Sequence, residues 1–177
     1  AAAVNVISAT TEAMIGDGVK VNTVEGGTDR SVRVRASDST LMVQTTGTVA
    51  GAGVTAVSGA NNTAVVNKTT SARIGDADVK ANNVEVSAFA KEDLHTITAN
   101  LSVGGVGAGA AVGVNVISNT TTASIGAGAD IDATGDLRLK AKQDTAADLY
   151  TVAGAGGVGA VSGAISVAVV SSKTSAH

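Results

Sequence analysis

Two closely spaced pairs of aspartates are the residues best suited to bind a metal ion. Asp76 and Asp78 follow one Ile-Gly step, and Asp130 and Asp132 follow another. Alternate residues of a strand share one face, so each pair could present two carboxylates to Ca²⁺ if a neighbouring segment added oxygen ligands. The G-G-x-G-x-D-x-U-x nonapeptide of calcium-binding β-rolls is absent from the sequence. We therefore favour the simpler interpretation, solvated acids at strand ends.

A second candidate site is a set of threonines at equivalent positions. The motifs "ATT", "KTT" and "TTT" contain Thr11, Thr70 and Thr121, and Thr174 occupies the same place near the end of the chain. Stacked strands would align these hydroxyls into a ladder, which usually pairs within the sheet. A flat threonine face would also suit an ice-binding or glycan-binding surface.

Other catalytic chemistry finds little support in the sequence. His95 and His177 are isolated, no cysteine is present, and neither G-x-S-x-G nor H-E-x-x-H occurs. The segment "GAGGVG" (154–159) matches G-x-G-x-x-G, but β-like "ISVAVV" follows it where a dinucleotide site needs a helix. We expect no enzyme activity, no cofactor and no catalytic residue. A unique acid and base cluster in a groove would instead indicate a β-helical polysaccharide lyase or hydrolase.

The composition requires an unusual core. Apolar residues make up 44% of the 177 residues but aromatic residues only 1%, so Ala, Val, Ile and Leu must fill the interior. Proline is absent and glycine occurs 22 times, which leaves long backbone pairing unobstructed. The net charge of -3 provides no basic field for nucleic acid. The first residues show no signal-peptide pattern.

The chain consists of tandem repeats. Four segments align without gaps around one alanine in each, at Ala13, Ala72, Ala123 and Ala176. A second anchor, in "SVRVRA" (31–36), "NVEVSA" (83–88) and "DLRLKA" (136–141), keeps the same period of about 53 residues. The stretch 22–30 reads as a lengthened turn. We divide the chain into repeats at approximately 1–59, 60–110 and 111–163 and a partial fourth at 164–177, a single segment excised from a longer array.

Within each repeat, apolar and polar residues alternate with period two, which indicates strands. Repeated short strands with small inward residues predict an all-β parallel β-helix, or β-solenoid, in which each coil pairs with the one before it. A period of about 53 residues would hold two coils of about 26 residues or three of about 18. The fragment would then be a rod about 35 to 50 Å long.

The uncharged run "VAGAGGVGAVSGAISVAVV" (152–170) has the length of a membrane helix. Its counterpart at 42–66 contains Gln44, Asn61 and Asn62, which a helix facing lipid would not tolerate, so we expect no membrane span. We interpret the run instead as one wall of the stacked core, where glycine and alanine permit close approach.

The segment "ASIGAGADIDATGDLRLKAKQDT" (123–145), followed by the uncharged run, resembles the repeats of leukotoxin-type filamentous adhesins and, more distantly, filamentous haemagglutinins of two-partner secretion. The resemblance spans the whole chain and implies a right-handed parallel β-helix that forms a stalk on a Gram-negative cell surface. It transfers no functional residues.

These observations predict an extracellular structural and adhesive segment. Its partners would be surface molecules of host or neighbouring cells, glycan or protein, and copies of itself stacked end to end through exposed solenoid ends. The alternatives are the β-helical enzyme and the ice-binding or glycan-binding solenoid described above.

Overall fold

The computed structural model describes residues 1–22 and 30–177, and it confirms the all-β prediction, with no helix in these residues. The proposed lengthened turn lies mostly in residues 23–29, outside the described residues. The strands are β1 (Ala2–Ile15), β2 (Lys20–Val21), β3 (Val32–Gly51), β4 (Thr55–Ile74), β5 (Asp78–Ala81), β6 (Val84–Val103), β7 (Val106–Ile125), β8 (Asp130–Ala133), β9 (Leu137–Gly156) and β10 (Gly159–Ala176).

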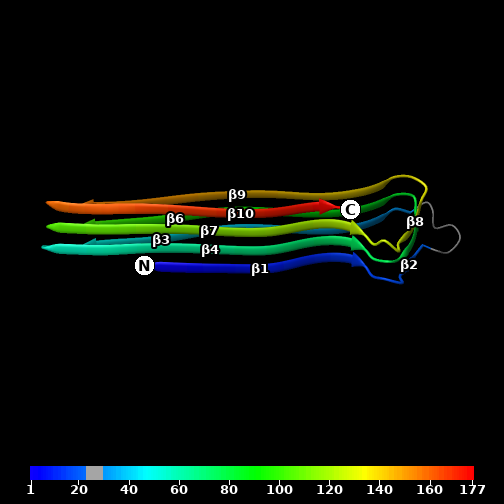
Figure 1. Ribbon diagram of the computed structural model, residues 1–177, viewed down its shortest axis with the longest axis horizontal. Helices are drawn as coiled ribbons and strands as arrows, with labels where there is room; N and C mark the ends of the chain where they lie inside the picture. The colour runs from blue at the N-terminus through cyan, green and yellow to red at the C-terminus, as the bar shows by residue number, and fades with distance from the viewer. Residues whose placement is uncertain (23–29) are drawn as a thin grey trace.

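Each strand pairs in parallel with the equivalent strand of the neighbouring repeat, as a parallel β-solenoid requires. Three sheets result: sheet A in the order β1-β4-β7-β10, sheet B in the order β2-β5-β8 and sheet C in the order β3-β6-β9. Sheets A and C are two long, roughly parallel layers, and the short sheet B closes one end between them (Figure 1). We call the end with sheet B the closed end and the opposite end, where β3, β6 and β9 turn into β4, β7 and β10, the tip.

Each repeat forms a single coil, so the prediction of two or three coils per repeat is wrong. Ala72 pairs with Ala123, and Val32 pairs with Val84, each one full period away. Ordinary strands of about five or six residues would turn several times in such a repeat. Here the strands of sheets A and C run for up to 20 residues without a turn, because neither proline nor a polar turn sequence interrupts them.

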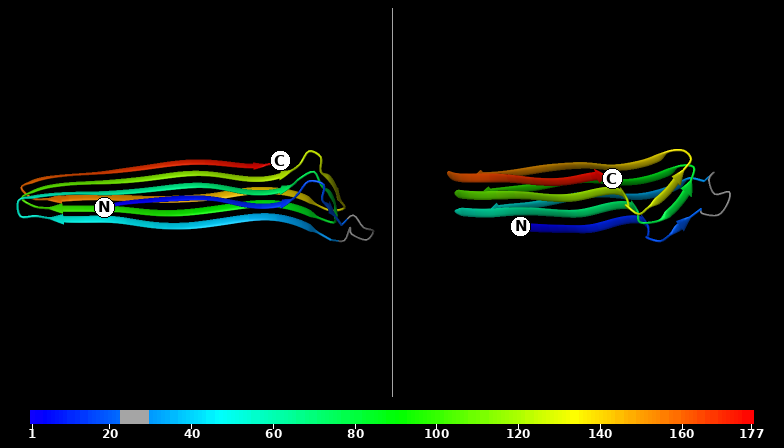
Figure 2. Two further views of the ribbon diagram at one scale, coloured as in Figure 1. Left: turned by 90° about the horizontal axis from the view of Figure 1, so that it is seen from below. Right: turned by 45° about the vertical axis from the view of Figure 1, so that its right-hand side comes forward.

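The molecule is consequently a thin slab and not the predicted rod. A strand of 20 residues spans about 65 Å, whereas four stacked strands of sheet A extend only about 14 Å along the solenoid axis. The two further views show the same elongated shape, with the strands of sheets A and C running along its long axis (Figure 2).

The uncharged run at 152–170 forms two walls of the slab and not one. It comprises the end of β9, the tip turn and the first part of β10. At that turn Gly157 has a φ of 144°, and a Cβ there would overlap the carbonyl oxygen of Gly104 in the coil below. In the part of the chain that the structure describes, no helix has the length and apolar character needed to cross a membrane.

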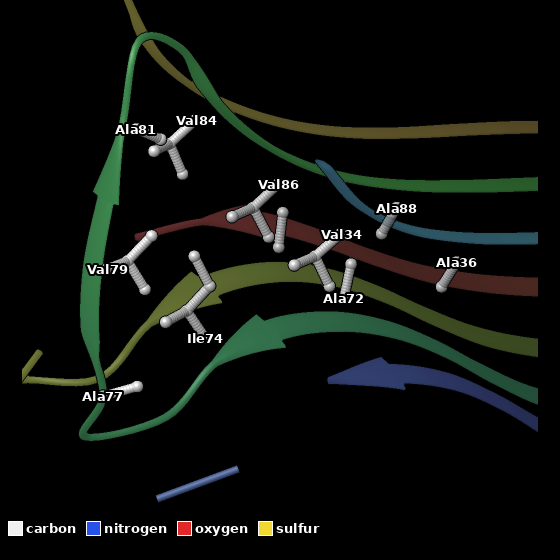
Figure 3. Close-up of a cluster of buried hydrophobic side chains, with 11 residues drawn as sticks. Val34, Ala36, Ala72, Ile74, Ala77, Val79, Ala81, Val84, Val86 and Ala88 are labelled. Atoms are coloured by element: carbon white, nitrogen blue, oxygen red, sulfur yellow. The ribbon is translucent and has the colours of Figure 1, made fainter. Parts of the chain in front are cut away.

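Small aliphatic side chains fill the closed end of the slab, as predicted. The anchor alanines stack in register, and Ala72, Ala88 and Ala123 are almost completely buried. Ile74 from sheet A, Val79 from sheet B and Val86 from sheet C meet there (Figure 3). Each coil adds only a thin layer of small side chains, mostly Ala and Val, and these fill the space between the three sheets without an aromatic ring.

The interior changes character towards the tip. A small second apolar cluster of Met42, Val66, Leu94 and Ile117 lies between sheets A and C. Beyond it the buried side chains are largely polar, including Asn62, Thr96, Thr98, Asn115 and Ser102. Several of these are satisfied across the slab: the Thr96 hydroxyl donates to Asn115 Oδ1 (3.1 Å), and Ser102 donates to the carbonyl of Ala56 (2.7 Å).

Candidate functional site

The candidate metal-binding aspartates lie at the closed end, on and beside sheet B. Asp78 pairs in register with Asp130, and Lys80 with Asp132. These side chains line a shallow groove together with Lys20, whose ammonium lies 3.5 Å from the Asp78 carboxylate. Across residues 1–22 and 30–177, no three His, Cys, Asp or Glu side chains gather as metal ligands. Two lysines, Lys20 and Lys80, thus lie among the three carboxylates of this groove.

Asp76 has a different position and a structural role. Its carboxylate accepts a hydrogen bond from the backbone N–H of Gly128 in the next coil (3.1 Å), and its own N–H donates to Asp17 Oδ1 (3.0 Å). A Cβ at Gly126 would stand 2.6 Å from Asp76 Oδ1, so only glycine leaves room for that carboxylate. Asp76 and the glycines of the next repeat, Gly126 and Gly128, thus connect adjacent coils at this corner of the slab.

The candidate threonines form the expected row, but the row faces the interior. Thr11, Thr70, Thr121 and Thr174 pair successively in register. Thr70 and Thr121 are fully buried, and Thr11 donates to Asp38 Oδ2 across the slab (3.1 Å). In the two central coils these hydroxyls cannot contact a ligand outside the molecule.

The outward face of sheet A carries a different set of hydroxyls, which the sequence analysis did not single out. Thr10, Thr69 and Thr120 pair in register, and Lys173 takes this position on β10. The next outward row contains Ser71, Thr122 and Ser175, with Glu12 at this position on β1. We call the six hydroxyl residues of these two rows the hydroxyl strip. Thr10, Thr69, Thr120 and Thr122 belong to the same "ATT", "KTT" and "TTT" motifs as the candidates, one residue out of phase with them. The two sets differ only in which of two alternate faces of the strand is the inward one, and the motifs themselves do not specify this.

A buried ionic cluster crosses the slab and is the most unusual polar arrangement in the described chain. Lys68 of sheet A contacts the Asp38 carboxylate and the Thr40 hydroxyl of sheet C, and its ammonium lies 3.9 Å from Glu92 Oε1. Thr145 donates to Glu92 Oε2 (3.0 Å). The side chains of Lys68 and Glu92 are 2% and 0% exposed, so this pair is fully desolvated.

Burial raises the pKa of the Glu92 carboxyl above its ordinary value, and the nearby Asp38 carboxylate acts in the same direction. The hydrogen bond from Thr145 and the charge of Lys68 oppose this shift. Because burial is the largest cause, Glu92 holds its proton more tightly than an exposed glutamate does.

This cluster is unique to its coils but has no access for a substrate. Asp38 pairs in register with Ala90, and Glu92 pairs with Thr40 and Thr145, so the charges do not repeat. Non-repeating acids with a perturbed pKa are the feature expected of the enzyme alternative. Glu92 nevertheless lies between the two sheets with no exposed surface, and not in a groove. The cluster therefore supports no hydrolytic mechanism.

The histidines lie on the surface. His95, on the outward face of sheet C, contacts its register partner Asp148 on β9 (3.0 Å) and Asp93 on its own strand (3.2 Å). His177 ends the chain, and its backbone pairs with Ala123 and Ile125. No nucleophile has a contact with either imidazole among the hydrogen bonds of the described residues.

No protein-family model matches the chain, and no significant match was found among curated proteins or among solved structures. The site must therefore be judged from its geometry alone.

Proposed function

We propose that the chain is a structural and adhesive segment of a filamentous extracellular adhesin, with the hydroxyl strip as its contact surface. The supporting observation is the registered repetition of this strip: Thr10, Thr69 and Thr120 occupy one outward row on three adjacent strands. Parallel strands lie about 4.8 Å apart, so β1, β4 and β7 present equivalent hydroxyl groups at that spacing, and Lys173 takes the position on β10. A row of identical weak contacts gives strong binding only through multivalency.

The partner that fits this surface is a cell-surface glycan or glycoprotein. Sugars present hydroxyls that both donate and accept hydrogen bonds, as Thr and Ser hydroxyls do. Charged side chains border these hydroxyls: Glu12 lies in the row of Ser71 and pairs with Arg73 (3.2 Å), and Lys173 lies in the row of Thr120. The activity proposed for this surface is binding without turnover.

A binding assay with displayed chain tests the proposal. Beads coated with the chain should adhere to cells or to a glycan array, and the Thr69→Glu/Thr120→Glu variant should adhere less. Ser39→Glu is the matched control, because Ser39 points outward from the opposite sheet. Equal adhesion by all three proteins would contradict the assignment of the strip.

The same strip also keeps the ice-binding alternative open, because its threonines are regularly spaced on a flat sheet. Thermal hysteresis of the chain, lost in the Thr69→Glu/Thr120→Glu variant without loss of fold, would favour ice over glycan as the ligand.

A further inference from the structure

The half of the slab nearer the tip has its polarity inverted. Along β4, β6 and β7 near the tip, the inward residues include Asn62, Thr98 and Asn115, each fully buried. The outward residues of the same strands include Val57, Ile97 and Val106, which are between 41% and 73% exposed. A protein surrounded by water normally shows the opposite arrangement, and large exposed apolar patches mark interaction surfaces.

A sharp boundary, aligned across the strands, limits this apolar surface on sheet A. The outward row Val6, Val65, Val116 and Val169 is continuous in register over all four strands. The next outward row towards the closed end is Ser8, Asn67, Ser118 and Ser171. A single step of two residues therefore changes the whole face from valine to polar side chains.

The apolar surface continues around the tip and onto sheet C. Ile97, Leu101, Val103 and Val152 point outward there, and Tyr150 lies at the boundary next to the row of His95 and Asp148. The tip turns add Val54 and Val158, which are 79% and 103% exposed. Residues 39–67, 96–129 and 149–172 contain no charged side chain. We call this surface, over both sheets and the tip, the apolar band.

Part of the backbone of the tip turns is paired. Ala52 N–H donates to the carbonyl of Val103 and Gly104 N–H to that of Gly156, both at 3.0 Å, and Val158 N–H donates to Gly105 (2.9 Å). These bonds join the tips of adjacent coils. They reduce the number of backbone groups that would be left without a partner in an apolar medium.

We propose that the apolar band inserts edge-on into the hydrocarbon region of a lipid bilayer, with the hydroxyl strip and the charged closed end outside it. A second copy of the chain fits less well, because two slabs in contact would cover one broad face each and leave the other face and the tip in water. Lipid covers both faces and the tip together. The tyrosine at the boundary matches the preference of aromatic residues for the membrane interface.

The depth of the band differs between the two sheets. On sheet C the outward apolar residues of β6 run from Ile97 to Val103, about 20 Å along the strand, and on sheet A those of β7 run from Val106 to Val116, about 33 Å. The face of sheet A thus matches the hydrocarbon thickness of about 30 Å, whereas the face of sheet C reaches beyond one leaflet only. Of the three polar residues that argued against a membrane helix, Gln44 and Asn62 point into the slab, whereas Asn61 points outward within the band.

Few polar groups lie within the band. On sheet A the outward polar side chains are Thr55, Asn61 and Thr63, of which Thr63 donates to Asn61 Oδ1 (3.2 Å), and Thr45 is the outward threonine on sheet C. The unpaired strand edges of the first and last coils would be costly in lipid, so we expect insertion of end-to-end stacks in preference to single chains.

Flotation with phosphatidylcholine vesicles tests this proposal on the full chain. We expect the chain to float with the vesicles, and Val116→Asp to reduce the bound fraction on the order of tenfold or more, because a carboxylate enters hydrocarbon at high cost. Ser118→Asp is the matched control on the same strand and face, one outward position beyond the band, and should bind as the parent chain does. Circular dichroism checks that both variants fold.

A spectroscopic arm does not depend on a charged variant. The chain has no tryptophan, so Val167→Trp and Ser171→Trp each place one reporter on the outward face of β10. Brominated lipid should quench the fluorescence of the first and not of the second. Equal quenching, absence of vesicle binding, or equal binding by both aspartate variants would overturn the proposal. The proposal would also be overturned if the parent chain bound no vesicles and Val116→Asp lost self-association. That result would assign the apolar band to contact with a second copy of the chain.

Discussion

Replacement of Lys68 by methionine should strongly destabilise the slab, because it leaves two buried carboxylates without their cation. The side chain of Lys68 is 2% exposed and that of Glu92 is 0% exposed, so water cannot compensate for the lost charge. Removal of one partner of a buried ion pair typically costs about 3–5 kcal/mol in the free energy of unfolding. Methionine has a similar length and adds no cavity, so the loss reports the electrostatics.

The effect of pH distinguishes this explanation from a packing defect. The pKa of Glu92 is raised in the folded chain, so between its ordinary value near 4.5 and the raised value the folded state binds more protons than the unfolded state. The unfolding free energy therefore increases as the pH falls through this window. Without Lys68, one cause that lowers the pKa is absent and the window widens. The deficit of Lys68→Met should be largest at neutral pH and shrink on acidification.

Urea unfolding followed by far-UV circular dichroism measures the deficit, at one protein concentration because association stabilises the folded state. Lys91→Met is the matched control, since Lys91 precedes Glu92 but points outward, and it should change stability by less than about 0.5 kcal/mol. The combined Asp38→Asn/Lys68→Met/Glu92→Gln variant should recover most of the loss. A deficit that is small, or independent of pH between 7 and 4.5, would refute the reasoning.

Three further predictions follow from the corners and the ends. Gly157→Ala should lower the free energy of unfolding by about 1–3 kcal/mol, because it combines a positive φ with overlap of the new Cβ on Gly104. Gly163→Ala is the control, since its Cβ would enter open space, and it should be neutral or slightly stabilising. Thermal unfolding of the two variants compares them. Asp76→Ala should lower the free energy of unfolding by about 0.5–1.5 kcal/mol, because it removes the hydrogen bond from Gly128 N–H. Since Asp76 has this structural role, excess CaCl₂ should not shift the melting temperature of the parent chain. The chain should associate end to end in sedimentation velocity, and Ala168→Lys on the uncovered inward face of β10 should suppress this; strictly monomeric parent chain at high concentration would contradict it.

The repeat anchors were sufficient to predict the class of fold. Equivalent alanines such as Ala72 and Ala123 do stack in register, because a residue as small as alanine fits the interior only when the same residue lies above and below it. Alternation around Val84 and Val86 likewise identified strands and their inward residues correctly. These are local properties of the chain, repeated once per coil.

The number of coils and the polar contacts across the slab depended on the tertiary structure. Nothing local in the sequence shows that a glycine-rich strand continues for 20 residues, since the partner strand that keeps it extended lies about one period away. Lys68 and Asp38 lie on opposite sheets and are 30 residues apart in sequence. Their contact requires the packing distance between the sheets, which no repeat spacing reveals.

The sequence by itself determined which residues repeat, and the tertiary structure decided which way they face. β4 is continuous from Thr55 to Ile74, so the burial of Ile74 and Ala72 in the core of the closed end sets the phase of the entire strand. Every second residue back to the tip then points inward, whether it is Val66 or Asn62, and Val65 and Val57 are left outside. A rigid strand cannot change faces midway without a bulge, and the best-packed segment therefore dictates the orientation of the rest.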